Sequence, residues 1–545
     1  LQGLERLEYR GYDSAGVALT APGMDKVVVR KKAGRLKNLV EDIERKPMPL
    51  ATVGIGHTRW ATNGEPSDVN AHPHTSMDGK VAIIHNGIIE NASQLRFDLQ
   101  AEGYRFASAT DTEVAAKLLG KIVDKIIADE GKPDLFKAVR RMARMLEGAF
   151  TILATDCRQP DIVVGARHDS PLVVGLGEGE NFLGSDVAAF VAYTKRAMEV
   201  DQDQAVCVSA DKVIVADFNG NVVENPKTYT VDWDASAAEK GGWDSFMDKE
   251  IHEDPAAVQR TLLGRFDTNG DITLDEVRID EHDFKAIDKI IVVACGTASY
   301  AGQVAKYAIE HWVRIPVEIE LAHEFRYRDP ILTPRTLVVA ISQSGETMDT
   351  LMALRHAREQ GSKVLAICNT QGASIPRESD AVLYTHAGPE VAVASTKAFV
   401  AQITAAYLLG LYLAQVKGAM FRDEIHQMLD SLKDMPRKIQ WVLDTQPKTI
   451  QAAAERMVNA NSFLFLGRHV GYPVALEGAL KLKEIAYTFT EGFAAGELKH
   501  GPIALVDEGE PVVFIVPPQR GRNVLHAKVI SGIEEVKARG AYIIA

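Results

Sequence analysis

The sequence predicts a multidomain protein in which an N-terminal α+β domain is followed by two α/β domains with parallel sheets. Three observations lead to this prediction. The chain has 545 residues, which is too long for one hydrophobic core. Short strand-like segments dominate residues 1–230, whereas apolar strands alternate with helices from about residue 286. The alternating pattern then occurs a second time, which indicates a tandem duplication.

Residues 1–230 contain short β-rich segments bounded by Gly, Pro, Asn or Asp, with helical periodicity between some of them. Strands are expected at 27–30, 52–57, 81–85, 150–155, 162–166, 172–175, 205–209 and 213–218, and helices at 36–43, 91–101, 112–129 and 135–146. Runs of strands with interposed helices predict antiparallel sheets covered by helices.

Residues 231–285 are polar and weakly periodic, apart from a helix-like stretch at 246–263, so we expect a linker. Within it, Asp267, Asn269 and Asp271 resemble the start of a calcium loop. Arg278, however, occupies the position of the bidentate Glu. We therefore expect a solvated turn and no metal site there.

The two α/β copies are expected at residues 286–425 and 450–545. Strand-like runs at 289–294, 336–341 and 363–368 in the first copy recur at 462–466, 511–516 and 541–545 in the second. In each copy the first of these strands, 289–294 or 462–466, is followed by a turn and a helix. Such units build parallel sheets whose ligands lie at the carboxyl edge.

The first copy has a hydroxyl-rich turn after its second strand, with the sequence Ser342-Gln343-Ser344-Gly345-Glu346-Thr347. The following helix start offers unpaired N–H groups and a positive dipole end, which suit a phosphate. The alternative is an ordinary capped helix. The second copy reads Pro517-Pro518-Gln519-Arg520-Gly521 at this position and should hold phosphate poorly.

Charged residues recur along one helix of the second copy, because Glu477, Lys481 and Glu484 share one stripe. Spacing alone favours an exposed face of Glu–Lys pairs. The alternative is an acid–base array that moves a proton between carbons. Downstream, His500 ends a Gly-bounded loop, where it is either solvated or a general acid–base.

In the first region, Asn86-Gly87 ends a predicted strand. The pair can present a side-chain amide and a backbone N–H as an oxyanion hole. A hairpin turn is the commoner meaning of Asn-Gly. His72-Pro73-His74 lacks a third ligand for a metal.

Composition excludes several classes of protein. The formal net charge of −13 argues against a nucleic-acid partner. No apolar run approaches the length of about 20 residues that a membrane span needs. The four cysteines lie far apart at positions 157, 207, 295 and 368, which fits a reducing cytoplasm.

Taken together, these stretches resemble the glutamine–fructose-6-phosphate aminotransferase (isomerising) family from end to end. The motifs that carry the resemblance are Tyr9–Gly16, Gly56–Thr62, His85–Asn91, Ser342–Thr347, Ser395–Phe399, Leu476–Glu484 and Glu497–Pro502. The resemblance implies an N-terminal glutaminase of the Ntn-hydrolase type (αββα) followed by two sugar-isomerase (SIS) domains. It also implies synthesis of glucosamine 6-phosphate for the hexosamine and UDP-N-acetylglucosamine route, in a cytoplasmic homodimer without metal or cofactor.

For glutamine, the resemblance implies that Arg59 holds the carboxylate and Asp111 the amino group. Asn86 and Gly87 should form the oxyanion hole, and Trp60 should help to gate an ammonia channel.

For the sugar, the resemblance implies that Glu484 shuttles the proton, His500 assists ring opening and Lys481 supports the chemistry. The residues expected to contact the sugar or its phosphate are Thr297, Ser342, Gln343, Ser344, Thr347 and Ser395.

The sequence departs from the family pattern at four places. The family nucleophile is an N-terminal Cys whose amino group serves as the base, whereas residue 1 here is Leu. We expect that segment, and a C-terminal segment carrying a Schiff-base lysine, to lie beyond the given sequence. Asn63 stands where His is expected, and Ala298 replaces a Ser that would give a phosphate hydroxyl.

Two alternatives stay open. SIS domains also serve as sugar-phosphate sensors without turnover, although a sensor needs no oxyanion hole. An aminotransferase acting on another phosphosugar would carry similar motifs.

Overall fold

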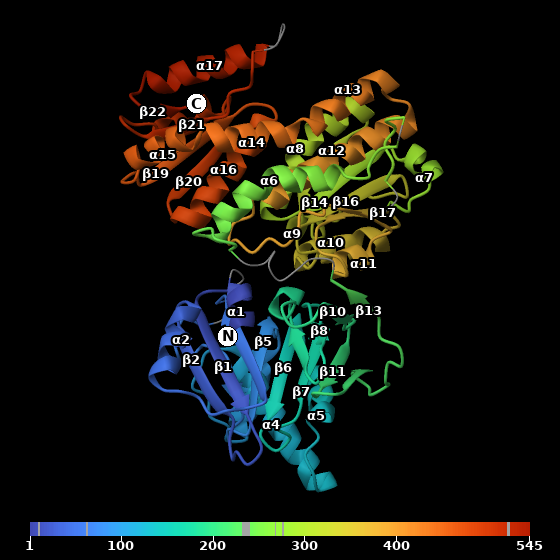
Figure 1. Cartoon of the computed structure of the whole chain (residues 1–545), viewed down its shortest axis with the longest axis vertical. Coiled ribbons are helices and arrows are strands. Elements are labelled where there is room, and N and C mark those ends of the chain that lie inside the picture. The colour runs from blue at the N-terminus through green and yellow to red at the C-terminus, as the bar shows by residue number, and fades with distance from the viewer. Residues whose placement is uncertain (9–10, 62–63, 232–239, 268, 275–276, 520–523) are drawn as a thin grey trace. The chain divides into compact units, whose positions relative to one another are not determined.

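The computed structural model describes residues 1–8, 11–61, 64–231, 240–267, 269–274, 277–519 and 524–545. The chain folds into two compact units, Leu1–Glu239 and Lys240–Ala545 (Figure 1). Asn63, Arg520 and Gly521, which the sequence singled out, lie outside the described residues.

The first unit consists of antiparallel sheets between helices, as predicted. Its sheets have the orders β2-β1-β3, β13-β10-β8-β9 and β12-β11-β7-β6-β5-β4. Strand β3 packs on β5 and β6, α2 covers the first sheet, and α4 and α5 cover the third. The layers are therefore α, β, β and α.

The bounds of these strands are β1 (Ser14–Thr20), β2 (Val28–Ala33), β3 (Val53–Arg59), β4 (His74–Thr75), β5 (Val81–Gly87), β6 (Phe150–Asp156), β7 (Val163–His168), β8 (Val173–Leu176), β9 (Asn181–Gly184), β10 (Arg196–Glu199), β11 (Gln204–Val208), β12 (Val213–Asp217) and β13 (Thr228–Thr230). The helices are α1 (Gln2–Leu7), α2 (Leu36–Arg45), α3 (Ala92–Ala101), α4 (Asp111–Glu130) and α5 (Leu135–Ala143), with a 3-10 turn η2 (Val187–Ala189).

Helices α4 and α5 both cover the six-stranded sheet, and α4 is the longer of the two. It begins at a Thr110 cap, whose side chain accepts a hydrogen bond from the Glu113 N–H, and it ends at Gly131 in the left-handed region. Leu118, Leu119 and Val123 pack with buried strand residues in one core. This core holds α4 against β5, and the Ile89 N–H, just after β5, donates to Asp111 at the start of α4.

The second unit contains a five-stranded parallel sheet of order β15-β14-β16-β17-β18. Alternate residues of β14 enter two different cores, since Ile290 packs with α8 and α12 and Ile291 packs with α9 and α10. Burial on both faces explains why its strands are continuous apolar runs. The strands are β14 (Lys289–Ala294), β15 (Val317–Leu321), β16 (Thr336–Ser342), β17 (Lys363–Cys368) and β18 (Ala381–Tyr384).

A second parallel sheet of order β20-β19-β21-β22 repeats the first arrangement, in which β14, β16 and β17 correspond to β19, β21 and β22. The predicted duplication is thus confirmed. The strands are β19 (Ser462–Gly467), β20 (Phe489–Ala494), β21 (Pro511–Phe514) and β22 (Tyr542–Ile544). The helices of the unit are α6 (Phe246–Leu262), α7 (Glu281–Ala286), α8 (Gly296–Val313), α9 (Ala322–Phe325), α10 (Met348–Glu359), α11 (Ser374–Glu378), α12 (Lys397–Lys417), α13 (Arg422–Lys433), α14 (Met435–Thr445), α15 (Pro447–Arg456), α16 (Gly471–Ala486) and α17 (Val524–Lys537), with 3-10 turns η4 (Leu498–His500) and η5 (Pro502–Leu505).

The segment expected to be a linker does not behave as one throughout. Helix α6 packs on α12 and α14, and Val258, Leu262 and Phe284 enter the core of the first parallel sheet. The segment is rich in polar residues, so its few apolar positions did not indicate from sequence that it joins a core.

The sequence analysis found no apolar run near the length of a membrane span, but α12 is such a run. By length and composition α12 could cross a membrane, yet 61% of the qualifying window is buried inside the protein, where α12 packs on α8 and α6. A central position in the core explains the apolar composition of this helix.

Candidate functional site

Asn86 and Gly87 are the last residues of β5 and pair with Thr151 and Phe150 of β6. Helices α3 to α5 separate β5 from β6 in the chain, so the hairpin-turn interpretation is wrong. Gly87 has a φ of +117°, and a Cβ there would lie 2.0 Å from the Ala149 carbonyl oxygen. Only glycine fits this position.

A buried histidine holds the Asn86 side chain. His57 Nε2 lies 2.8 Å from Asn86 Oδ1. Burial lowers the pKa of His57 to about 4, so the ring is neutral at pH 7 and its Nε2–H donates to the amide oxygen. The amide nitrogen of Asn86 is then directed away from His57, as an oxyanion donor requires.

Arg59 and Asp111 supply opposite charges near this strand end. Burial lowers the pKa of Arg59, while the carboxylates of Asp111 and Asp13 counteract that effect. Asp111 begins α4 and accepts hydrogen bonds from the N–H groups of Ile89 (3.0 Å) and Thr112 (2.9 Å). The structure thus places Arg59, Asn86, Gly87 and Asp111 in one neighbourhood. Trp60 follows Arg59 and is exposed, with its ring 5.5 Å from that of Tyr12.

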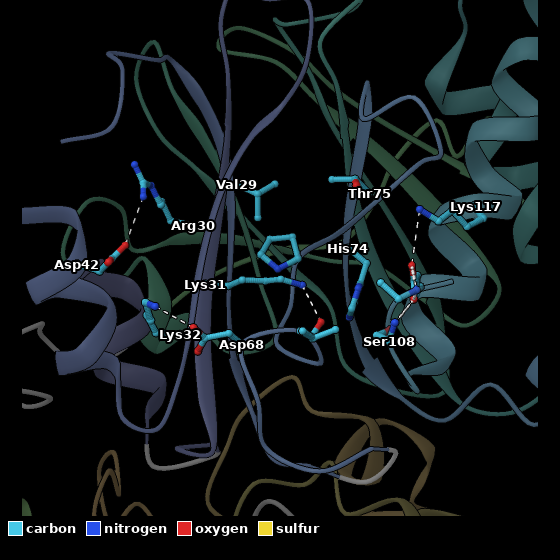
Figure 2. A pocket seen from close by; sticks show the side chains of 14 residues that line it. Val29, Arg30, Lys31, Lys32, Asp42, Asp68, His74, Thr75, Ser108 and Lys117 are labelled. Carbon is cyan, nitrogen blue, oxygen red and sulfur yellow. Dashed lines mark hydrogen bonds and ion pairs between the residues drawn. The ribbon is translucent and has the colours of Figure 1, made fainter. Parts of the chain in front are cut away.

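A separate cavity of about 650 Å³ lies between β2, β4 and the start of α4 (Figure 2). None of the residues expected to bind glutamine lines it. Lys31 points to backbone carbonyls, with Nζ 2.7 Å from the Ala71 oxygen, and burial lowers its pKa to about 8. Other charged side chains in the wall of the cavity are neutralised by ion pairs, namely Arg30–Asp42, Lys32–Asp68 and Lys117–Glu113. We assign this cavity no part in the chemistry.

In the second unit, the turn after β16 gathers hydroxyl groups as predicted. Ser342 Oγ lies 3.0 Å from Thr347 Oγ1 and accepts a hydrogen bond from the Gly345 N–H. Thr347 is the N-cap residue of α10, but its side chain makes no capping bond. The hydroxyls bond to the turn itself, which departs from an ordinary capped helix. Gly345 has a φ of +68° and lies against Cys368 and Ala373.

The start of α8 contacts α16, the helix that follows β19 of the second parallel sheet. Thr297 Oγ1 donates to Glu477 Oε1 (3.1 Å) and accepts from Lys481 Nζ (3.0 Å). Lys481 also pairs with Glu477 at 3.3 Å and Glu484 at 2.6 Å. Because β14 and β16 are adjacent, the start of α8, which holds Thr297, and the end of β16, which holds Ser342, are neighbours at the sheet edge.

The exposed-face interpretation of the Glu–Lys stripe is therefore wrong. Only 7% of the Glu477 side chain and 18% of that of Lys481 is exposed. Burial raises the pKa of Glu477, and the Lys481 ammonium opposes this shift. Sequence reasoning placed Glu477 on the stripe but did not select it as a site residue. Its i, i+4 spacing to Lys481 was the available signal.

In the described part of the chain, no hydrogen bond or ion pair joins two further predicted residues, Ser395 and His500, to this group. Ser395 Oγ donates to Glu390 Oε2 (2.9 Å) just before α12. His500 is exposed in η4, and among the described residues no hydrogen bond joins its ring to Lys481 or Glu484. Ala298 is buried in the first turn of α8.

Comparison with known proteins agrees with this division of the chain. Residues 57–192 match the glutamine amidotransferase domain, and residues 284–412 and 456–545 match the SIS domain. The glutamine–fructose-6-phosphate aminotransferase (isomerizing) of Corynebacterium diphtheriae is 63% identical over 544 residues, which cover 100% of this chain and 86% of that protein. The chain belongs to this family.

Other relatives extend the comparison. The glutamine–fructose-6-phosphate aminotransferase (isomerizing) of Streptomyces coelicolor is 59% identical over 541 residues, with 99% of this chain and 86% of that protein covered. A solved structure of the C-terminal domain of the Francisella tularensis glucosamine-fructose-6-phosphate aminotransferase is 40% identical. It covers 56% of this chain and 84% of that chain, with a TM-score of 0.53.

The family matches contain both groups of candidate residues. Arg59, Asn86, Gly87 and Asp111 lie in the amidotransferase match, and Thr297, the Ser342–Thr347 turn and Lys481 lie in the SIS matches. The sequence-based assignment to the glutamine–fructose-6-phosphate aminotransferase family is confirmed.

Proposed function

We propose that this chain transfers the amide nitrogen of glutamine to fructose 6-phosphate and isomerises the product to glucosamine 6-phosphate. Relatives that carry the activity in their names share 54% to 63% identity with it. The proposal treats residues 1–230 as the glutaminase and residues 286–425 and 450–545 as the sugar-handling SIS domains, with 231–285 between them.

In the glutaminase, Arg59 binds the carboxylate of glutamine and Asp111 binds its amino group. The amide nitrogen of Asn86 and the N–H of Gly87 stabilise the oxyanion that forms when the side-chain amide is attacked. Support comes from the bond that His57 makes to the Asn86 oxygen, since it leaves the amide nitrogen as the free donor. An ammonia channel gated by Trp60 stays a prediction.

One observation carries the sugar half of the proposal, namely the Thr297–Glu477–Lys481 contact. It joins acid–base groups of α16 to the start of α8, and β14, which precedes α8, is the neighbour of β16. A phosphate held by Thr297, Ser342, Gln343, Ser344 and Thr347 would place the sugar carbons near Glu484. Glu484 then moves the proton between neighbouring carbons, and Lys481, 2.6 Å away, orients it. Ser395 and His500 are proposed to contact the sugar and assist ring opening.

The proposal also covers assembly and location. We expect a homodimer, and sedimentation that shows only a monomer would contradict it. All four cysteines are free thiols, which supports a cytoplasmic location.

The test is a product assay on the protein expressed from its complete gene. With glutamine and fructose 6-phosphate, mass spectrometry should detect glucosamine 6-phosphate that carries the amide nitrogen of labelled glutamine. Absence of a hexosamine product would overturn the proposal. Binding of fructose 6-phosphate without turnover would establish the sensor alternative instead.

Two variants test whether the hydroxyl groups of the predicted turn contribute to sugar-phosphate binding. Ser344→Ala removes a hydroxyl of the predicted phosphate turn and should weaken fructose 6-phosphate binding about tenfold. Ser379→Ala is the matched control, because its hydroxyl donates to the Ile375 carbonyl in α11. Equal affinity in both variants would remove the turn from the site.

A further inference from the structure

Three side chains of different chemistry converge at the carboxyl edge of the first parallel sheet. Cys295 follows β14, His323 lies in α9 after β15, and Asp349 is the second residue of α10. The Cys295 sulfur, a His323 ring nitrogen and an Asp349 carboxylate oxygen lie within 4.8 Å of one another. Each comes from a separate segment, so the fold rather than local sequence brings them together.

These distances suit a shared metal ion. Zinc bonds to sulfur at about 2.3 Å and to imidazole nitrogen or carboxylate oxygen at about 2.0–2.2 Å, which places tetrahedral donor atoms roughly 3.5 Å apart. His323 and Asp349 are exposed, so rotation of their side chains can close the remaining distance. Cys295 is half-buried and follows the buried end of β14, which gives the site a fixed anchor.

The chemical nature of the three ligands determines which metal ions the site would favour. A thiolate and an imidazole favour zinc or cobalt, whereas magnesium and calcium prefer oxygen ligands alone. Binding exchanges the thiol proton of Cys295 for the metal, and the proton passes to solvent. Three protein ligands leave one tetrahedral position for water or another ligand.

We propose that Cys295, His323 and Asp349 form a binding site for Zn²⁺ or a similar divalent transition metal. This site is distinct from the sugar site, because Thr297 faces Glu477 and Lys481 whereas Cys295 packs with the core of α9 and α10. A bound ion would connect the turn after β14 to the starts of α9 and α10.

The test uses cobalt as a spectroscopic probe. After treatment with a chelator and desalting, the protein is titrated with Co²⁺. We expect a thiolate-to-cobalt charge-transfer band that saturates at one equivalent and disappears when Zn²⁺ is added. The absorption band does not depend on catalysis, so the titration tests the metal site separately from the proposed function.

Variants identify the ligands. Cys295→Ser should abolish the band. His323→Ala and Asp349→Asn should weaken Co²⁺ binding about 100-fold, because loss of even an outer-shell partner costs roughly 10–100-fold. His282→Ala, which removes an exposed histidine of α7 outside the cluster, should leave the titration unchanged.

Several results would overturn the proposal. They are the absence of a band in the unmodified protein, a band that persists in Cys295→Ser, and equal affinity in His323→Ala and His282→Ala. His323 and Asp349 are exposed, so their variants are expected to fold. Unchanged circular dichroism and melting temperature would show that a lost band reflects a lost ligand.

Discussion

His57 is the residue that orients the candidate oxyanion hole, since its ring lies 2.8 Å from the Asn86 amide oxygen. We predict that His57→Ala lowers kcat for glutamine hydrolysis by about 10–100-fold, less than the 10²–10³-fold typical for loss of an oxyanion donor. KM for glutamine should change little, because Arg59 and Asp111 remain. Steady-state kinetics on the complete gene product measure both constants.

Two further variants separate positioning from a general loss of structure. His57→Gln keeps a donor that can reach Asn86 and should recover part of the activity. The double variant His57→Ala/Asn86→Ala should be no slower than Asn86→Ala alone, because both changes remove the same interaction. Additive losses, or a raised KM with unchanged kcat, would contradict a positioning role.

Gly345 controls the shape of the predicted phosphate turn. It has a φ of +68°, and a Cβ there would lie 2.6 Å from the Ala373 Cβ and 2.8 Å from the Cys368 sulfur. Gly345→Ala should therefore displace the turn and weaken fructose 6-phosphate binding by at least tenfold, a loss of about 1.4 kcal/mol. Isothermal titration calorimetry measures this loss.

Gly361 provides the matched control for that prediction. It also has a positive φ, +86°, but a Cβ at this position would meet nothing within 4 Å, and the residue follows α10 rather than preceding it. Gly361→Ala introduces only the backbone strain of about 1–2 kcal/mol and should keep normal sugar-phosphate affinity. Equal affinity losses in the two variants would show that strain alone, and not the turn, is responsible.

Among the elements, those with a strong local pattern were predictable from sequence. The expected strand at 289–294 coincides with β14, because continuous β-branched residues suit a strand buried on both faces. Strand β1 was missed, since Ser14-Ala15-Gly16 has little β-propensity. Its conformation comes from pairing with β2 on one side and β3 on the other.

The same contrast applies to the candidate site. The Ser342–Thr347 turn could be predicted because a strand, a hydroxyl-rich turn and a helix follow one another in sequence. Thr297 and Glu477 are 180 residues apart, so no local pattern could show their hydrogen bond. The Cys295, His323 and Asp349 cluster was missed for the same reason, because its members come from three separate segments.

Helix α6 carries buried carboxyl groups against the start of α12. Burial raises the pKa of Glu250 and of Asp254 to about 7 each. Glu253 and Glu390 are further acids in this cluster, and Lys397, which pairs with Glu253 at 2.5 Å, supplies positive charge. Charging Asp254 in this setting opposes folding.

The stability of the second unit should therefore depend on pH. A carboxyl whose pKa is raised on folding stabilises the protein below its unfolded pKa of about 4, and that contribution is lost as pH rises through 7. Asp254→Asn should thus raise the free energy of unfolding by about 2–4 kcal/mol at pH 8 and by little at pH 4. Urea denaturation at both pH values measures the difference.

The control for this element is Asp248→Asn on the same helix. Asp248 is 46% exposed and pairs with His252, so its replacement should change stability by less than about 0.5 kcal/mol at pH 8. If Asp254→Asn were equally neutral at pH 8, charge in the α6–α12 cluster would not limit stability.

At the scale of the whole molecule, the two compact units are predicted to melt separately, because each has its own cores. Fructose 6-phosphate at about 100 times its Kd should stabilise the second unit by about 2.7 kcal/mol and raise its Tm by roughly 5 °C. A glutamine analogue that resists hydrolysis should move only the transition of the first unit. Differential scanning calorimetry distinguishes the two, and a single transition shifted by both ligands would contradict separate units.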